Sequence, residues 1–428
     1  MGTATSADDT LVHPQRKRLE RLPVFELLVA FSLFPAVYTG ADRLQPLEAV
    51  SPVTPYYLAF AAAMILGAAI VVREGSVDGR SVLVLGAAVA FVGWAALSLQ
   101  WTVGTDAYAW QKLSRLAVIN TTLLAFGLVL ASSRRRVVAF GFVMGLVGVW
   151  LTLEAIYAVS VLETLPFATV GSETYLTHGR AIGFAVPIAT YLAVSHPDRV
   201  IRTLCGLLVG LLVVGLLLVG SRGPFLAVVV ALAGFAGLET AASFTRGSAD
   251  RRTPVATLGL VTLVLGAVGG AFWMHGRVPW TFERLRTAGG DGESETRLFM
   301  FREALDLWRV RPVRGHGLGA FDVLTETVHT YPHNLLAEVL SELGLVGLVL
   351  VALVMVPPVM AALRARLASG DALYSALVAL FVFAVVNAAF SFDLHGNRQL
   401  WFTAGLLALV WTESDGNRLD IQFSGSDR

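Results

Sequence analysis

A short polar segment, Pro332-His333-Asn334, stands immediately before a long apolar run and offers residue types suited to chemistry. A helix that begins here presents free N–H groups and the positive end of its dipole, so an anion bound at this point is stabilised. Glu338 and Glu342 follow four residues apart and share one face of the same helix. Carboxylates buried in a membrane helix are costly and are functional candidates for that reason. Pairing with arginines that hold the helices together is an alternative interpretation of both glutamates.

Arginines stand at the ends of two other apolar runs. Arg222 occurs in VGSRGPF, which leaves two or three residues for a hairpin, and Arg180 begins a run in THGRAIGF. An arginine at such a boundary is either a functional charge or a side chain that anchors the helix at the membrane surface. The DLHGNR turn contains Asp393, His395 and Arg398, and we interpret it as a polar loop rather than a site.

The segment RPVRGHGLGAFDVL contains a string of glycines, Gly315, Gly317 and Gly319. Glycine permits a tight turn or a close approach of the backbone to a ligand. A plain turn is the more common explanation for such a string, so the glycines alone do not define a site.

The composition places these candidate residues in a membrane protein. Of 428 residues 55% are hydrophobic and 15% are charged, whereas soluble domains are about 25% charged. This excludes a soluble enzyme, a disordered chain and a nucleic-acid-binding protein. The net charge of +1 indicates no polyanionic partner, and the single cysteine, Cys205, excludes an internal disulfide or a cysteine-based metal site.

Apolar runs of about 20 residues span a bilayer as helices. The sequence therefore predicts an all-α, polytopic integral membrane protein with twelve transmembrane helices. The expected spans are residues 23–40, 52–72, 81–99, 113–131, 137–162, 180–195, 203–220, 223–243, 255–274, 334–363, 372–391 and 399–412.

Basic residues predict the orientation of these spans. One set of loops and tails carries 18 Lys and Arg, and the short loops of the opposite set carry six. By the positive-inside rule we expect a multi-pass protein of the cytoplasmic membrane with cytoplasmic tails at residues 1–22 and 413–428. Helices one to nine then occupy residues 23–274, and helices ten to twelve occupy 334–412. The six basic residues of the short outer loops are Arg43, Lys112, Arg115, Arg180, Arg222 and Arg398.

Residues 275–333 form a long extracytoplasmic loop between the ninth and tenth spans. The loop holds four of the eight histidines, and a loop of this length with structure of its own usually carries function. Within it, ESETRLFMFREALDLWRV predicts an amphipathic helix that either lies along the membrane surface or caps the bundle. The expected apolar face contains Leu298, Phe301, Leu305 and Trp308.

Several motifs are absent from the sequence. The first outer loop, residues 41–51, has Asp42 and Glu48 but no Asp-x-Asp pair, and no His/Asp cluster has metal-ligand spacing. The chain also lacks a P-loop, a nucleophile elbow and a dinucleotide fingerprint. We therefore expect neither a metal nor a cofactor.

Three segments resemble the signature blocks of the O-antigen ligase and polymerase family. They are SRGPFLAVVVALAG, RPVRGHGLGAFDVL and HNLLAEVLSELGLVGLVLVAL, and they occur in the family's order with a large outer loop between spans nine and ten. The resemblance implies a glycosyltransferase that moves a glycan from a polyprenyl diphosphate carrier to an acceptor outside the membrane. It also implies a metal-independent reaction with inversion at the anomeric carbon, in which the partners are the lipid-linked donor, a glycan or glycolipid acceptor and membrane lipids.

The resemblance also assigns roles to individual residues. His333 is the catalytic residue it implies, and a neutral imidazole suits proton abstraction from a sugar hydroxyl. Arg222, Arg180 and Arg314 are the implied diphosphate-binding residues, because arginine matches phosphate oxygens in bidentate fashion. The segment around Arg180 lacks the Asn-Pro-Asn that many members show, so this assignment departs from the family pattern. From the residues themselves, rather than from the resemblance, Glu338, Asn334, Gly315 and Gly317 are candidates for supporting roles.

Two other functions remain consistent with the residues. A polymerase of the same family uses the same donor but joins repeat units into a capsule, exopolysaccharide or teichuronic-type polymer. A transporter or flippase for lipid-linked sugars belongs to a different class, and it should show repeat symmetry with charges at the middle of the membrane. The candidate polar residues here gather at the outer face instead.

Overall fold

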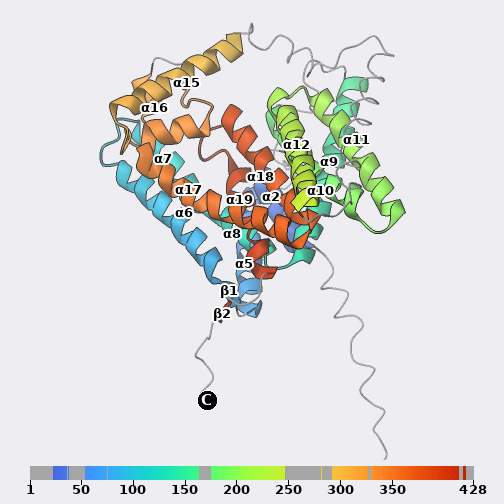
Figure 1. The fold of residues 1–428 in the computed structure, drawn as a ribbon. Coiled ribbons are helices and arrows are strands. Elements are labelled where there is room, and N and C mark those ends of the chain that lie inside the picture. The colour runs from blue at the N-terminus through green and yellow to red at the C-terminus, as the bar shows by residue number, and fades with distance from the viewer. Residues whose placement is uncertain are drawn as a thin grey trace, which may run out of the picture.

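The computed structural model describes residues 23–35, 37, 54–74, 76–162, 175–245, 281, 292–325, 329–413 and 418–420. Helices dominate this part of the chain (Figure 1). The first half contains α2 (Val24–Leu33), α5 (Pro55–Glu74), α6 (Gly79–Ser98), α7 (Asp106–Ser114), the π-helical η2 (Arg115–Asn120), α8 (Thr121–Leu130), α9 (Arg134–Ser160), α10 (Tyr175–Ser195), α11 (Arg199–Val219) and α12 (Arg222–Thr245). The second half contains α15 (Gly292–Val310), α16 (Phe321–Leu324), α17 (Leu335–Ser369), α18 (Ala372–Phe390), α19 (Arg398–Leu406) and α20 (Leu409–Glu413), and the strands are β1 (Ser76–Asp78) and β2 (Arg418–Asp420).

Eight of the described helical stretches are long and apolar enough to cross a membrane. They coincide with the predicted second, third, fourth, fifth, seventh, eighth, tenth and eleventh spans. The predicted first, sixth and twelfth spans also occur as helices, namely α2, α10 and α19–α20, but none of these meets that criterion. The predicted ninth span, residues 255–274, lies outside the described residues. The prediction of a polytopic helical protein is therefore supported, whereas the count of twelve stays a prediction.

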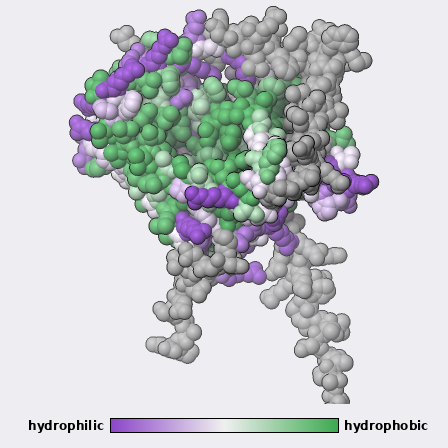
Figure 2. Space-filling model, viewed as in Figure 1, coloured by the Kyte–Doolittle hydropathy of each residue, from purple (hydrophilic) through white to green (hydrophobic). Residues whose placement is uncertain are grey.

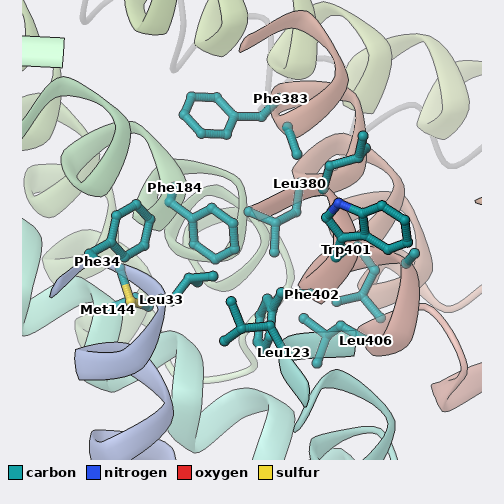
Figure 3. Packing of buried hydrophobic residues seen from close by; sticks show 14 of the residues in the cluster. Leu33, Phe34, Leu123, Met144, Phe184, Leu380, Phe383, Trp401, Phe402 and Leu406 are labelled. Atoms are coloured by element: carbon teal, nitrogen blue, oxygen red, sulfur yellow. The ribbon is translucent and has the colours of Figure 1, made fainter. Parts of the chain in front are cut away.

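The helices pack around a core of aromatic rings (Figure 3). Phe184 on α10 lies at its centre, with the ring centroids of Phe34, Phe140, Phe383 and Phe402 between 5.6 and 6.3 Å away. Such aromatic pairs contribute about 0.5–1.5 kcal/mol each beyond the area they bury. They tie α10 to α9, α18 and α19. Hydrophobic side chains also cover much of the visible outer surface (Figure 2), as expected for helices that face lipid.

Several predicted cytoplasmic loops lie together at one end of the bundle, where β1 pairs antiparallel with β2 (Figure 1). At this end Arg134 forms an ion pair with Asp371, and Arg136 pairs with Glu74 at 2.6 Å. The C-terminal strand and the α5–α6 connection are therefore on the same side of the bundle. Which side faces the cytoplasm stays a prediction.

Helix α17 is interrupted at Gly344, which has φ 66° and ψ −164°. A neighbouring segment of the 311–319 loop lies against the break, so that the Gly317 amide donates to the Glu342 carbonyl at 2.8 Å. On the other side of the break the Leu345 amide donates to the Pro312 carbonyl at 2.9 Å. A Cβ on Gly344 would lie 2.3 Å from the Val313 carbonyl oxygen, so only glycine fits. The break divides α17 into a short segment beside the candidate site and a long segment that runs to the other end.

The predicted amphipathic helix is confirmed as α15, whereas the placement of its apolar face at the membrane surface or on the bundle stays a prediction. The residues that bury completely are Met300 and Ala304, which pack on Phe321 and Ala337. Leu298, which belongs to the expected apolar face, is 50% exposed. The helix is therefore rotated toward its small and flexible side chains, because these fit closely against α17.

Candidate functional site

A cavity of about 340 Å³ lies where α12, α15, α17 and α18 meet. Its polar lining includes Arg222, Arg297, His333 and Asn334, which come from segments far apart in the sequence. Apolar side chains complete the wall, namely Leu226, Leu298, Phe301, Pro332, Ala389 and Phe390. Two guanidinium groups and an imidazole thus face a largely apolar space.

Arg222 is positioned by a tight hairpin. Helix α11 ends at Val219 and is capped by Gly220, whose φ of 75° is left-handed, and α12 begins at Arg222. The Ser221 hydroxyl donates to the Tyr175 carbonyl at 3.1 Å, which fixes the hairpin against the start of α10. A Cβ on Gly179 would lie 2.1 Å from the Ser221 hydroxyl oxygen, so glycine allows this approach. The predicted hairpin is confirmed, and it holds Arg222 at the cavity.

His333 precedes the first turn of α17 in a strained conformation. Its φ is 54°, and among the described residues the other non-glycine residue with positive φ is Phe392, in the turn after α18. Asn334 caps the helix by accepting from the Ala337 amide at 3.0 Å, and its side-chain amide donates to the Ala389 carbonyl at 3.0 Å. Left-handed backbone at bulky residues gathers at functional sites, where the surroundings enforce it. Asn334 thereby locks His333 against the end of α18.

Arg297 is a cavity residue that the sequence analysis did not single out. It lies on α15 one turn before Phe301, and its guanidinium donates to the Phe390 carbonyl at 3.2 Å. The available signal was an arginine next to the predicted apolar face of the amphipathic helix. That signal has little power by itself, because charged residues flank the apolar face of most such helices.

Arg180 is buried behind the cavity wall and is not part of its lining. Its guanidinium donates to the Asn397 side chain at 3.1 Å and to the Asn387 and Ser391 carbonyls at 2.9 and 3.0 Å. It also lies over the ring of Phe392, 4.3 Å from the centroid. The alternative of an interface anchor is wrong, because the residue is 1% exposed. Arg180 instead holds the turn that follows α18.

Arg314, Gly315 and Gly317 also lie outside the cavity lining. Arg314 is exposed, with its guanidinium 5.6 Å from the Trp101 ring centroid. A Cβ on Gly315 would meet the Glu342 carbonyl oxygen at 2.3 Å, and one on Gly317 would meet the backbone of the 101–104 loop. The two glycines therefore allow the backbone of the 311–319 loop to approach the α17 break closely. They do not line the cavity.

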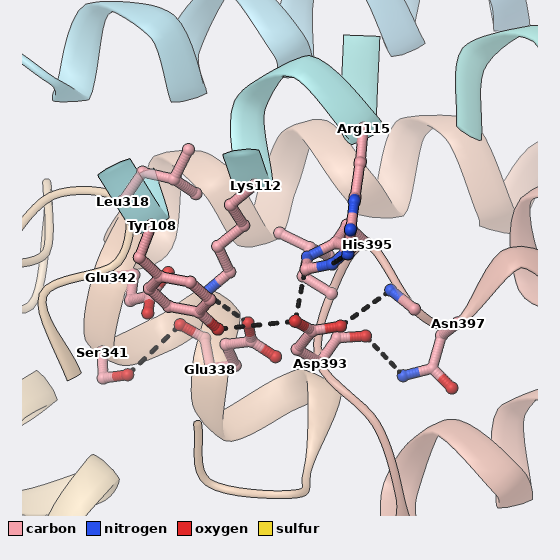
Figure 4. A network of polar contacts seen from close by, with 12 residues as sticks. Tyr108, Lys112, Arg115, Leu318, Glu338, Ser341, Glu342, Asp393, His395 and Asn397 are labelled. Atoms are coloured by element: carbon pink, nitrogen blue, oxygen red, sulfur yellow. Dashed lines mark hydrogen bonds and ion pairs between the residues drawn. The ribbon is translucent and has the colours of Figure 1, made fainter. Parts of the chain in front are cut away.

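Glu338 and Glu342 belong to a buried ion cluster (Figure 4). Lys112 on α7 lies 2.5 Å from a carboxylate oxygen of Glu338 and 2.6 Å from one of Glu342. All three side chains are at most 1% exposed. The interpretation that arginines pair with these glutamates is wrong, because their partner is a lysine. Lys112 was expected in a short outer loop, whereas the structure places it within a helix.

The turn after α18 extends this cluster. Tyr108, one turn before Lys112, donates to Asp393 at 3.4 Å, and Asp393 lies 2.9 Å from a ring nitrogen of His395. Arg115 lies 2.9 Å from the other ring nitrogen of His395. One face of α7–η2 therefore contacts both α17 and the turn after α18, to which Arg180 also donates hydrogen bonds (Figure 4). The interpretation of DLHGNR as a plain polar loop was incomplete, and Arg398 from this motif starts α19 with its guanidinium 3.4 Å from the Tyr56 hydroxyl.

Two titratable groups near the site have shifted pKa values. Burial acts to raise the pKa of Asp393, but the hydrogen bond and charge of His395, together with Lys112, hold it below its ordinary value. Burial raises the pKa of Tyr331 to about 12, so this phenol keeps its proton at neutral pH. The Tyr331 ring centroid is 4.4 Å from that of His333. Tyr331 is therefore a neutral neighbour of the imidazole.

Among the residues that the structure describes, no group of three or more His, Cys, Asp or Glu side chains is arranged to hold a metal ion. The expectation of a metal-independent reaction stays a prediction.

Comparison with known families gives a match between residues 206–352 and the family described as O-antigen ligase. The matched segment runs from α11 into α17 and contains Arg222, Arg297 and His333. No curated protein matches the chain significantly. The family match confirms the resemblance drawn from the sequence motifs.

Proposed function

We propose that this member of the O-antigen ligase and polymerase family transfers a glycan from a polyprenyl diphosphate carrier to an acceptor hydroxyl at the cavity between α12, α15, α17 and α18. In this proposal the cavity opens to the extracytoplasmic side, and the reaction inverts the anomeric carbon without a metal. The protein is then a multi-pass enzyme of the cytoplasmic membrane.

The observation that carries the proposal is the convergence of His333, Arg222 and Arg297 on one cavity. These residues are separated by 36 to 111 positions in the sequence, and each is positioned by different local contacts. A hairpin places Arg222, a capped helix start places His333, and a hydrogen bond to the last residue of α18 places Arg297. A base beside two fixed cations suits a reaction in which a proton leaves one reactant while negative charge grows on the other.

In the proposed reaction the acceptor hydroxyl oxygen forms a bond to the anomeric carbon of the donor. The bond between that carbon and the diphosphate oxygen breaks, and the polyprenyl diphosphate departs with the electron pair. His333 accepts the hydroxyl proton through an imidazole nitrogen, which makes it the general base. Such assistance typically accelerates a reaction by about 10²–10⁴-fold.

Arg222 and Arg297 are proposed to bind the diphosphate. Their charges stabilise the phosphate oxygens more strongly as the glycosidic bond breaks, because the leaving group gains negative charge in the transition state. Arginine supplies this charge at any working pH and forms paired hydrogen bonds to phosphate. The apolar lining next to them, including Leu226 and Phe301, suits the first part of the polyprenyl chain.

The remaining predicted site residues receive indirect roles in this proposal. Arg180 holds the turn after α18, whose neighbouring carbonyls at Ala389 and Phe390 accept from Asn334 and Arg297. Glu338 and Gly315 maintain the position of α17 rather than contacting substrate. Arg314 stays a candidate for diphosphate binding that the cavity lining does not favour.

The test uses purified protein and a polyprenyl diphosphate glycan donor. His333→Asn is the informative substitution, because asparagine tolerates a positive φ but cannot act as a base. We expect it to lower single-turnover rates by about 10²–10⁴-fold while donor affinity changes little. Arg222→Lys and Arg297→Lys should each weaken donor binding and turnover, because an ammonium does not reproduce a bidentate contact.

Arg309→Lys is the matched control, since Arg309 is also on α15 but is 68% exposed and pairs with Asp306. Normal turnover in His333→Asn at normal expression would refute the assignment of the base. Wild-type donor affinity in both cavity lysine variants would refute the diphosphate site. Glycan profiling of a deletion strain then distinguishes the two candidate functions. Polymer that is not attached to its acceptor indicates a ligase, whereas single repeat units that are still attached indicate a polymerase.

A further inference from the structure

A second cavity, of about 770 Å³, lies between α6, α17 and α20. Arg80 and Arg364 line it together with apolar side chains, among them Leu83, Leu353 and Trp411. Its lining shares no residue with the candidate active-site cavity. Arg364 lies 29 residues after the first residue of α17, or roughly 40 Å along the helix from the His333 end. The two cavities therefore occupy opposite ends of α17.

This cavity is a groove on the lipid-facing surface. Leu83 is 73% exposed and Leu353 is 50% exposed, although both lie on helices apolar enough to span a membrane. Pro357 lines the groove and is followed by Pro358, so α17 lacks two amide donors at this level. Much of the surface over α6 and α17 is hydrophobic, as Figure 2 shows. A hydrocarbon chain can therefore lie along the groove without leaving the bilayer.

Three other arginines near this end of the bundle differ from the two arginines of the groove. Arg134, Arg136 and Arg366 are paired with Asp371, Glu74 and Glu239, respectively. Within the described residues, the guanidinium groups of the two groove arginines have no carboxylate partner. Both lie close to helix ends, since Arg80 is the second residue of α6 and Arg364 is five residues from the end of α17. In a bilayer, their guanidinium groups would therefore lie near the depth of the lipid phosphates.

We propose that this groove binds an anionic phospholipid, with its phosphate between Arg80 and Arg364 and one acyl chain against Leu83 and Leu353. Charge complementarity selects a lipid with net negative charge, because two unpaired arginines meet one headgroup. The cavity volume lies within the range of about 300–1,000 Å³ that is usual for ligand sites. The bound lipid joins α6 to the second segment of α17. The proposal does not depend on the glycosyltransferase assignment.

The test measures lipid binding to the full-length protein by native mass spectrometry, with phosphatidylglycerol competing against phosphatidylcholine. Two arginines at a membrane surface correspond to a preference of roughly 30-fold for the anionic lipid. We expect Arg80→Gln/Arg364→Gln to remove this preference. Ala361→Trp should also remove it, because Ala361 lines the groove and the larger side chain fills it while both charges remain.

Arg199→Gln/Arg202→Gln is the matched control, since it removes two arginines from the first turn of α11, which is outside the groove lining. This control should keep the preference for phosphatidylglycerol. Thermal unfolding provides a second readout: phosphatidylglycerol should raise the melting temperature of the native protein and of the control, but not of the groove variants. Equal binding of both lipids, equal effects of control and groove variants, or the same stabilisation by soluble glycerol phosphate would each overturn the proposal.

Discussion

The buried ion cluster on α7 and α17 predicts an asymmetric response to substitution. Lys112 contacts two carboxylates, and Lys112, Glu338 and Glu342 are all almost completely buried. Lys112→Met keeps the length and apolar stem of the side chain but leaves both carboxylates without a cation. Breaking a buried ion pair by removing one partner costs about 3–5 kcal/mol, because the remaining charge stays desolvated. We therefore expect Lys112→Met to lower the free energy of unfolding by at least about 3–5 kcal/mol.

Removing one carboxylate should have a much smaller effect. Glu342→Gln leaves a one-to-one pair between Lys112 and Glu338, and the new amide oxygen still accepts a hydrogen bond. The expected loss is about 1 kcal/mol, the net value of a typical hydrogen bond. The triple variant Lys112→Met/Glu338→Gln/Glu342→Gln contains no buried charge at these positions and should recover most of the stability lost in Lys112→Met.

Thermal unfolding of the detergent-solubilised protein, followed by near-UV circular dichroism, measures these differences. Arg309→Met is the control, because its ion pair with Asp306 is exposed on α15 and contributes little. Two results would refute the reasoning. One is a loss in Glu342→Gln as large as that in Lys112→Met, and the other is a triple variant that is no more stable than the single lysine variant.

Other predictions concern the helix break, acidity, metals and topology. Gly344→Ala should lower the free energy of unfolding by more than about 1–3 kcal/mol, because Gly344 has a positive φ and lies close to the Val313 carbonyl. Gly234→Ala is the control: no atom lies within 4 Å of the added methyl group, so this variant should be neutral or stabilising in the same thermal unfolding experiment. Because the pKa of Asp393 is lowered, its ionised carboxylate stabilises the folded protein above the ordinary carboxyl pKa, and this stabilisation is lost as pH falls through the lowered value. His395→Gln should shift this loss to higher pH, which thermal unfolding at a series of decreasing pH values would measure. Transfer activity should persist in excess chelator, and a loss that Mg²⁺ restores would contradict the arginine-based mechanism. A cysteine at Ser369 should react with impermeant reagents only from the cytoplasmic side, and labelling from outside would reverse the proposed topology.

Local sequence patterns predicted the elements of this fold well. Apolar runs located α9, α11, α12 and α18 within a few residues, because a membrane helix needs a continuous apolar stretch. The polar segment Pro332-His333-Asn334 marked the start of α17, and the SRGP segment marked the hairpin at Arg222. These features depend on residues that are neighbours in the chain.

The candidate site was less predictable, because its contacts join distant segments. Lys112 lies 226 and 230 positions from the two glutamates it contacts, and no periodicity in the sequence connects them. The sequence did not distinguish Arg297 from other charged residues on an amphipathic helix, and only the structure places it in the same cavity lining as Arg222. The burial of Met300 rather than Leu298 likewise reflects the shape of α17, which the sequence of α15 does not contain.

The break in α17 has a consequence for biogenesis. A helix interrupted within a membrane exposes backbone groups that hydrocarbon cannot solvate, and each such group costs several kcal/mol. Here the carbonyls of Ser341, Glu342 and Leu343 accept from the His316 amide, the Gly317 amide and the Trp94 indole, and the Leu345 and Val346 amides donate to the loop in return. The loop leaves the ribosome before α17, but it can satisfy these groups only after α17 has entered the bilayer beside α6. The final form of α17 therefore depends on contacts from the 311–319 loop and from α6, and not on the hydrogen bonds of α17 alone.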